Sequence, residues 1–190
     1  IVAPFGRYAD KAVKYYDTGR DHIHHSVDLS LQLMGIEQID LLLIHRPDPM
    51  MDHHETGAAL DALIKSGKVK AVGVSNFKPH DWTLLQSAMT SRPVTNQIEI
   101  SVMAIDAFTN GDLAHLQERG IPAMAWSPLG GGALFGDPAP VVAVELTRIA
   151  ERLETDLASL AYAWLLAHPA QIVPVIGTNS IDRIRALGRV

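Results

Sequence analysis

The stretch Ile39-Asp-Leu-Leu-Leu-Ile-His-Arg-Pro47 decides the fold of this 190-residue chain. Its apolar run stops at His45, and Pro47 then lacks the backbone donor that a continuing strand would need. Strands of a parallel sheet covered on both faces read as continuous apolar runs rather than as alternating ones. We therefore predict a buried parallel strand that carries an imidazole at its carboxyl end, and His45 is the first candidate for chemistry.

Helical and strand patterns alternate from about residue 21 onward, which predicts βα units and a parallel sheet. We expect helices at 21–34, 55–66, 81–89, 112–119, 140–153 and 157–168. The other strands are expected at 69–74, 94–98, 122–126 and 172–176. Residues 1–20 show no such pattern, and we expect a long loop there, of the kind that often contributes to a site.

The composition is that of a globular chain with enough apolar residues for one domain, at 47% hydrophobic and 19% charged residues. The 16 Lys and Arg are scattered among 21 Asp and Glu, so we expect no nucleic-acid partner. The lack of cysteine excludes disulfides and thiolate metal sites. No signal peptide and no membrane-spanning apolar run is present, which predicts a cytoplasmic protein without a membrane partner. The sequence leaves the oligomeric state open.

The expected fold class is α/β, as a (β/α)8 TIM barrel of which this chain holds about five of the eight βα units. A barrel places the carboxyl ends of all its strands on one face, where the loops form the active site. An open doubly wound sheet also fits the alternation. The barrel is favoured because polar or glycine-rich residues follow every expected strand and no Gly-x-Gly-x-x-Gly follows any of them. In a barrel, the first three strands would precede Ile1.

Five motifs occur in order along the chain. They are Asp-Leu-Leu-Leu-Ile-His at 40–45, Gly-Lys-Val-Lys-Ala-Val-Gly-Val-Ser-Asn-Phe at 67–77, Asn-Gln-Ile-Glu at 96–99, Trp-Ser-Pro-Leu-Gly at 126–130 and Pro-Val-Ile-Gly-Thr at 174–178. Together they resemble the motifs of the aldo-keto reductases, within a bacterial branch of general oxidoreductases. The resemblance covers nearly all of residues 21–190, and it implies a single reductase domain over residues 1–190.

The resemblance implies an NADP-dependent oxidoreductase that reduces the aldehyde or ketone carbonyl of a small molecule to an alcohol. Hydride passes from reduced nicotinamide to the carbonyl carbon, and a positioned acid protonates the oxygen on which negative charge grows. In the family that acid is a tyrosine, assisted by a lysine paired with an aspartate, and a histidine hydrogen-bonds the carbonyl oxygen. His45 matches the histidine. A structural histidine at a strand end is the alternative.

The motifs of the family's aspartate, tyrosine and lysine do not occur in this chain. The tyrosines and lysines of the leading loop lack the expected context, and we leave them unassigned: Tyr8, Tyr15, Tyr16, Lys11 and Lys14. We expect that the chain is a fragment of a longer carbonyl reductase and that it is inactive by itself. A naturally degenerate member of the family is the alternative.

The resemblance also implies a nicotinamide site. Ser75 and Asn76 match positions that hydrogen-bond the nicotinamide carboxamide, and Gln97 matches a third contact to that amide. Three polar contacts to one amide fix which face of the ring meets the substrate. Trp126 matches an aromatic position that stacks on the nicotinamide ring, and an ordinary core tryptophan is the alternative.

Two later segments match the family's phosphate-binding parts. Ser127, Leu129 and Gly131 fall where the family's loop passes under the pyrophosphate, and glycine lets the backbone approach a phosphate closely. The residues that match the 2′-phosphate segment of NADP-binding members are Gly177, Thr178, Asn179 and Arg183.

We prefer NADPH to NADH as the cofactor. Arg183 is planar and permanently charged, which suits a phosphate. Asp182 is the only acidic residue near this segment that could hold the ribose diol of NADH instead. Many relatives carry a lysine at the position of Gly177 and polar side chains at those of Ala186 and Leu187, so this segment departs from the family pattern.

Two further classes of function fit parts of the sequence. Nine histidines, among them adjacent His53 and His54, invite a metal-dependent hydrolase. No His-Glu-x-x-His motif is present, and we expect a solvated surface there and no metal. The cofactor motifs also fit a non-catalytic, redox-sensing nucleotide-binding module. Turnover by the full-length protein distinguishes that module from an enzyme.

Overall fold

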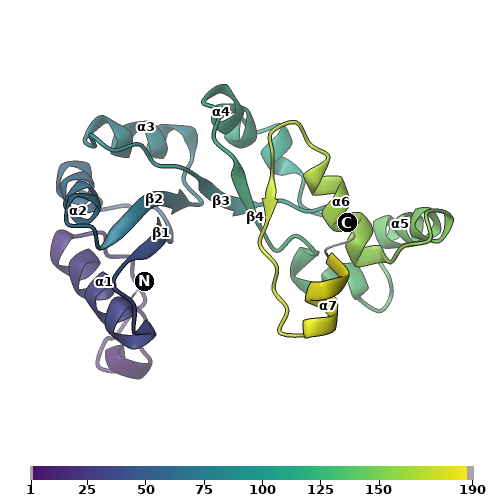
Figure 1. Cartoon of the computed structure of the whole chain (residues 1–190), viewed down its shortest axis with the longest axis horizontal. Helices are drawn as coiled ribbons and strands as arrows, with labels where there is room; N and C mark the ends of the chain where they lie inside the picture. Colours follow the sequence, from purple (N-terminus) through teal and green to yellow (C-terminus); the bar gives the residue numbers. More distant parts are fainter. Residues whose placement is uncertain (1, 188–190) are drawn as a thin grey trace. The chain divides into compact units, whose positions relative to one another are not determined.

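The computed structural model describes residues 2–187, in which strands and helices alternate along most of the chain (Figure 1). The strands are β1 (Ile39–Ile44), β2 (Val69–Ser75), β3 (Asn96–Glu99), β4 (Ala123–Trp126) and β5 (Val173–Pro174). The α-helices are α1 (Arg20–Met34), α2 (His53–Lys65), α3 (Pro79–Ser87), α4 (Asp112–Glu118), α5 (Val141–Arg152), α6 (Leu157–Leu166) and α7 (Ile181–Ala186). Short 3-10 helices are η1 (Gly6–Tyr8), η2 (Asp106–Phe108) and η3 (Gly130–Phe135).

The strands are hydrogen-bonded in the order β1-β2-β3-β4-β5, which is also their order in the sequence. The pairs β1/β2 and β4/β5 run parallel. Parallel neighbours joined through helices are βα units, so the predicted organisation is confirmed. Contacts divide the chain into two compact units, Ile1–Asn96 and Gln97–Val190.

Every expected helix and strand is present, with its ends within two residues of the predicted ones. The helix α3 begins at Pro79, two residues before the predicted start. The signals that were missed are Pro79 in the first turn and Asp81, whose carboxylate accepts the backbone N–H of Lys78 at 3.0 Å. Proline is well suited to the first turn of a helix, where its missing donor would be unpaired anyway. The helix α7 and the three 3-10 helices were not predicted.

In the first unit, β1 pairs with β2 in a register that places Ile44 beside Val74. A Cβ atom on Gly73 would lie 2.7 Å from Leu43 Cδ2 and 2.8 Å from the backbone oxygen of Thr95. The neighbouring strands therefore approach β2 too closely there for a larger residue. Apolar side chains of α2 pack into this core, and Leu60 and Leu63 are at most 1% exposed.

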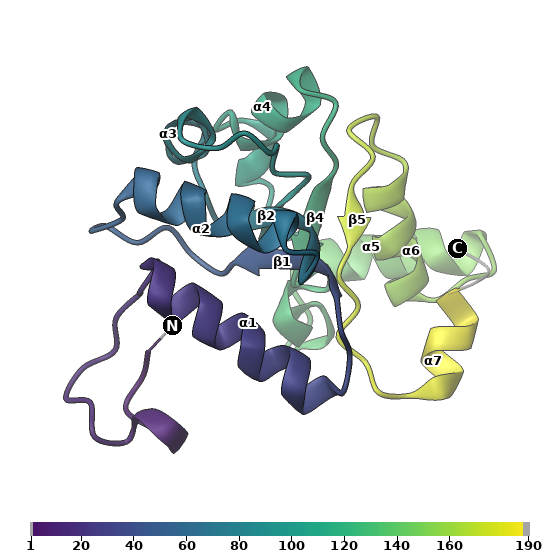
Figure 2. The same cartoon turned by 60° about the vertical axis from the view of Figure 1, so that its left-hand side comes forward.

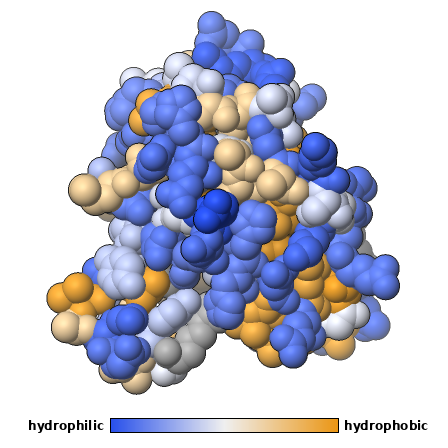
Figure 3. All heavy atoms as spheres, turned by 90° about the vertical axis from the view of Figure 1, so that its left-hand side faces the viewer, coloured by the Kyte–Doolittle hydropathy of each residue, from blue (hydrophilic) through white to orange (hydrophobic). Residues whose placement is uncertain are grey.

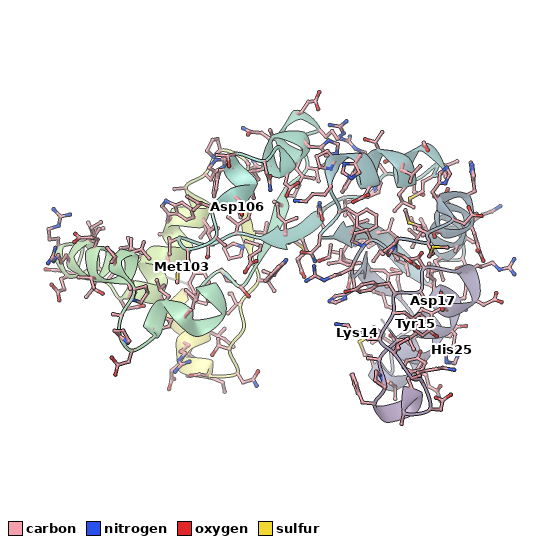
Figure 4. The ribbon with its side chains drawn as sticks, turned by 180° about the vertical axis from the view of Figure 1, so that it is seen from behind. Lys14, Tyr15, Asp17, His25, Met103 and Asp106 are labelled. Carbon is pink, nitrogen blue, oxygen red and sulfur yellow. The ribbon has the colours of Figure 1, made fainter. Side chains whose placement is uncertain are left out.

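The segment before α1 was expected to be a long loop, and most of it is irregular. It also contains η1 and an antiparallel bridge in which Val2 and Tyr15 exchange backbone hydrogen bonds of 2.9 Å. The segment folds back beside α1, and Lys14, Tyr15 and Asp17 lie along it (Figures 2 and 4). The buried Thr56 hydroxyl donates to the backbone oxygen of Thr18 at 2.8 Å, which fixes the segment to α2.

In the second unit, β4 and β5 pair in a register that places Ala125 beside Pro174. The core contains Leu134 of η3, Ala143 of α5 and Ala161 of α6, with Leu129 packed against them. Close packing of α5 and α6 on η3 therefore positions the glycine-rich segment that follows β4.

The face of the first unit shown in Figure 3 is mostly hydrophilic, with apolar side chains along its lower edge. The exposed large apolar side chains of this unit include Phe5, Leu33 and Met34. Within residues 2–187, the structure contains no helix of sufficient length and apolar character to cross a membrane.

Candidate functional site

His45 lies at the carboxyl end of β1, directly after the buried Ile44. Its imidazole is partly exposed, and it borders a cavity of about 160 Å³ between α1 and β1. Partial burial lowers the pKa of His45, and the charge of neighbouring Arg46 lowers it further. The imidazole is therefore neutral at neutral pH, and one ring nitrogen carries a proton that can be donated in a hydrogen bond.

Ser75 and Asn76 lie at the corresponding end of β2. Because Ile44 pairs with Val74, the next residues on the two strands, His45 and Ser75, are neighbours at one edge of the sheet. Asn76 has a left-handed backbone with φ of 59°, and its amide nitrogen donates to the Ser75 hydroxyl at 2.8 Å. Asparagine tolerates this conformation better than most residues, and such positions often occur at functional sites.

Asn96 was not predicted as a site residue. Its side chain is 3% exposed and donates to the backbone oxygen of Phe77 at 2.7 Å, so it fixes the turn that follows Ser75 and Asn76. The other amide atom, Asn96 Oδ1, is buried without a hydrogen-bond partner among the described residues. An asparagine in the middle of the strand expected at 94–98, at the start of the Asn-Gln-Ile-Glu motif, was the sequence signal that could have drawn attention to it.

Gln97 and Trp126 belong to the second unit and are both half-buried. Gln97 is the second residue of β3, and Trp126 is the last residue of β4. Both therefore lie on strands whose carboxyl ends precede polar segments. Their roles in binding nicotinamide stay predictions.

The second unit contains a cavity of about 920 Å³. Its walls are the segment after β4, one face of α6, and the chain from Val175 to Leu187. Six of the residues predicted to bind phosphate groups line it: Ser127, Leu129, Gly131, Gly177, Thr178 and Arg183. Asn179 is not among the lining residues. The structure thus brings together two segments that are about fifty residues apart in the sequence.

The glycine-rich wall has an unusual backbone. Ser127, Gly130, Gly131 and Gly132 all have positive φ, with values of 49°, 62°, 63° and 96°. A Cβ atom on Gly130 would come within 3.0 Å of the Met103 sulfur. Glycine is therefore required here for two reasons: it adopts a positive φ without strain, and it has no side chain to meet Met103. Gly131 and Gly132 of this turn line the cavity, and the lack of a side chain lets a phosphate approach their backbone closely.

The wall that follows β5 is held by side-chain hydroxyls. Thr178 Oγ1 accepts the backbone N–H of Ser180 at 3.2 Å, and Ser180 Oγ accepts the backbone N–H of Arg183 at 3.4 Å. Asp182 lies 3.8 Å from the guanidinium of Arg185. The guanidinium of Arg183 has no ion pair and no hydrogen bond with any residue from 2 to 187, so it is available to an anion in the cavity.

The wall formed by α6 was not predicted from the sequence. Asp156 caps this helix, because its carboxylate accepts the backbone N–H of Ser159 at 2.9 Å and the Ser159 hydroxyl at 2.7 Å. These hydrogen bonds lower the pKa of Asp156, so a negative charge lies on the cavity wall. The cap pattern Asp-x-x-Ser is readable in the sequence, whereas its place beside Thr178 and Arg183 is not.

Groups of three or more metal-binding side chains are absent from residues 2–187. The rings of His53 and His54, which had suggested a hydrolase, lie 4.1 Å apart at the start of α2. Tyr15, one of the unassigned residues of the leading segment, is 40% exposed. Lys11, another of them, pairs with Asp10 at 3.2 Å.

Comparison with known proteins gives the family. A sequence profile described as the aldo/keto reductase family matches residues 9–190. The chain belongs to the aldo/keto reductase family. It is 60% identical over 185 residues to 6-dehydroglucose reductase of Agrobacterium fabrum, covering 97% of this chain and 62% of that protein. It is 40% identical over 172 residues to 6-dehydroglucose reductase of Novosphingobium aromaticivorans, covering 89% of this chain and 57% of that protein.

The fold of this aldo/keto reductase chain matches that of a thermostable aldo-keto reductase crystallised with the inhibitor epalrestat. The TM-score is 0.84 at 26% sequence identity, over 90% of this chain and 61% of that one. This likeness confirms the predicted TIM-barrel class, with five of its strands present, and excludes the open doubly wound sheet. The chain spans about three fifths of the length of these relatives.

Proposed function

We propose that the full-length protein is an NADPH-dependent reductase of aldehyde or ketone carbonyls. The observation that carries the proposal is the cavity of the second unit, because six residues predicted to bind the cofactor's phosphate groups line it together. The guanidinium of Arg183, which has no partner among residues 2–187, and a turn of consecutive glycines fit phosphate groups in charge and in space. A crystal structure of an aldo-keto reductase from Klebsiella pneumoniae, which has this fold, contains NADPH.

In this proposal His45 orients the carbonyl group of the substrate. When bound, NADPH supplies the hydride that forms the new C–H bond at the carbonyl carbon. The neutral imidazole donates a hydrogen bond to the carbonyl oxygen, and this bond strengthens as negative charge grows there. The proton that completes the alcohol comes in the family from a tyrosine, for which this chain has no matching motif.

The preference for NADPH over NADH depends on the balance of charge in the cavity. Arg183 has no partner among residues 2–187, whereas Asp182, the acidic residue that could have held a ribose diol, faces Arg185. These observations favour a 2′-phosphate. The carboxylate of Asp156 on the same cavity wall works against it. We infer that NADPH is preferred and that NADH is also accepted.

For the substrate, we propose a small sugar carbonyl. Two relatives, at 60% and 40% identity, carry the name 6-dehydroglucose reductase. The alternative is a non-catalytic, redox-sensing nucleotide-binding module. It is favoured by the observation that His45 is the one member of the family's catalytic set that has a matching motif in this sequence.

The test is turnover by the full-length protein. We expect it to consume NADPH in the presence of 6-dehydroglucose and to form glucose, with a higher kcat/KM than with NADH. Glucose in place of 6-dehydroglucose is the negative control, because it lacks the additional carbonyl group. Tight NADPH binding without turnover of this aldehyde or of simple aromatic aldehydes would support the redox-sensing module instead.

A further inference from the structure

Tyr162 lines the cavity of the second unit, although no family motif includes it. It is 6% exposed and lies on α6, the helix that Asp156 caps. Ala158 and Ser159, which precede it by four and three positions, line the same cavity. Residues with this spacing share one face of an α-helix. That face of α6 is therefore turned toward the cavity.

The hydroxyl of Tyr162 makes no hydrogen bond with any residue of the described chain, 2–187. Burial raises the pKa of this phenol, so its proton stays on the oxygen at neutral pH. A buried tyrosine hydroxyl usually has a hydrogen-bond partner, because leaving it without one costs free energy. The Tyr162 hydroxyl is not among the fully enclosed polar atoms that lack a partner, so it is open to water or to a molecule bound in the cavity that the side chain lines.

The other polar groups of the cavity indicate the partner's charge. Asp156 and Ser159 satisfy each other, as the Ser159 hydroxyl donates to the Asp156 carboxylate at 2.7 Å. Among the described residues, the side chains on these walls whose donors make no hydrogen bond with the chain are Tyr162, Arg183, Ser127 and Thr178. Several unused donors around one space, one of them a guanidinium, fit an anionic oxygen.

We propose that Tyr162 is a cofactor-binding residue whose hydroxyl donates a hydrogen bond to a phosphate oxygen on the adenosine half of NADPH. The adenosine half is indicated because Tyr162 shares the cavity with Thr178 and Arg183, which match the 2′-phosphate segment. The inference rests on the proposed function, because it names a further contact in the same cofactor site.

The test compares Tyr162→Phe with wild type in the full-length protein. Phenylalanine keeps the ring and removes the oxygen alone. We expect the Kd of NADPH and of adenosine 2′,5′-bisphosphate to rise about tenfold, which corresponds to about 1.4 kcal/mol of binding free energy. The melting temperature of the free protein should be unchanged or higher, because the hydroxyl loses no protein partner. Tyr15→Phe, in the leading segment outside this cavity, is the matched control.

The possible results distinguish the role of Tyr162 from the proposed function of the protein. Unchanged affinity for both ligands in Tyr162→Phe would overturn the role of Tyr162 and leave the proposed function intact. A loss confined to NADPH would overturn the assignment to the adenosine half. A lower melting temperature of the free variant together with the weaker binding would show that the hydroxyl has a structural role. Failure of the wild-type protein to bind NADPH would instead contradict the proposed function.

Discussion

At the scale of single residues, His45 shows how its surroundings set the chemical state of a side chain. Partial burial and the charge of Arg46 both lower its pKa, which favours the neutral ring although the side chain is largely exposed. A neutral ring is a hydrogen-bond donor without a net charge. It suits a carbonyl oxygen that is neutral before hydride transfer and negative afterwards.

His45→Ala should lower kcat of the full-length protein about a hundredfold, since removal of one such donor typically has that effect. The change in KM should be much smaller, because the hydrogen bond strengthens in the transition state. Steady-state kinetics with an aldehyde substrate measure both values. His25→Ala is the control, because His25 is an exposed residue of α1 (Figure 4). Equal kcat values for the two variants would contradict the role of His45.

Asp156→Asn tests the charge on the cavity wall. Asparagine caps helices about as well as aspartate, so the start of α6 should be retained while the negative charge is lost. We expect the Kd of NADPH to fall roughly threefold, because a like charge is removed from the vicinity of a phosphate. The Kd of NADH should change less. An equal change in both dissociation constants would show that Asp156 does not act on the 2′-phosphate.

At the scale of elements, the sheet of the first unit depends on a glycine. Gly73 lies in β2 where Leu43 of β1 and Thr95 both come within 3 Å of the position that a Cβ atom would occupy. Adjacent strands hold their backbones at fixed spacing, so the added carbon cannot be accommodated by the motion of one flexible side chain. The same pair of strands carries His45 and Ser75 at its carboxyl end.

Gly73→Ala should therefore lower the free energy of unfolding by about 2 kcal/mol, the usual cost of overpacking a core. Urea denaturation measures it. Gly177→Ala is the matched control, because no atom lies within 4 Å of its added Cβ and its φ is not positive. We expect that control to stay within about 0.5 kcal/mol of wild type. Equal stabilities of the two variants would show that β1 and β2 adapt to the extra carbon.

At the scale of the whole molecule, we expect catalysis to need groups whose motifs this chain lacks. The motifs of the family's tyrosine, lysine and aspartate are absent from the sequence, and the chain spans 62% of its Agrobacterium relative. We expect residues 1–190 expressed alone to show no NADPH-dependent reduction of an aromatic aldehyde. Measurable turnover by this polypeptide would show that some other acid of the chain can protonate the carbonyl oxygen.

Local pattern determined much of the structure. The apolar run at 39–44 predicted β1, and the spacing of Ile23 and Val27 predicted α1, because burial of a strand or of one helix face imposes its own period. The 3-10 helix at Gly130–Phe135 was not predicted, because glycine permits many backbone conformations and packing against Met103 and Ala143 selects one.

The sequence alone therefore determined the alternation of strands and helices. It also determined the order of the family motifs, two of which contain or precede residues that line the cavity. It could not predict that Asp156 and Tyr162 of α6 border the same cavity as Thr178 and Arg183. Helical period shows which residues share a face, but not what that face contacts. The parallel pairing of β4 with β5 and the packing of α6 against β5 place these residues around one cavity, since only long-range contacts bring these segments together.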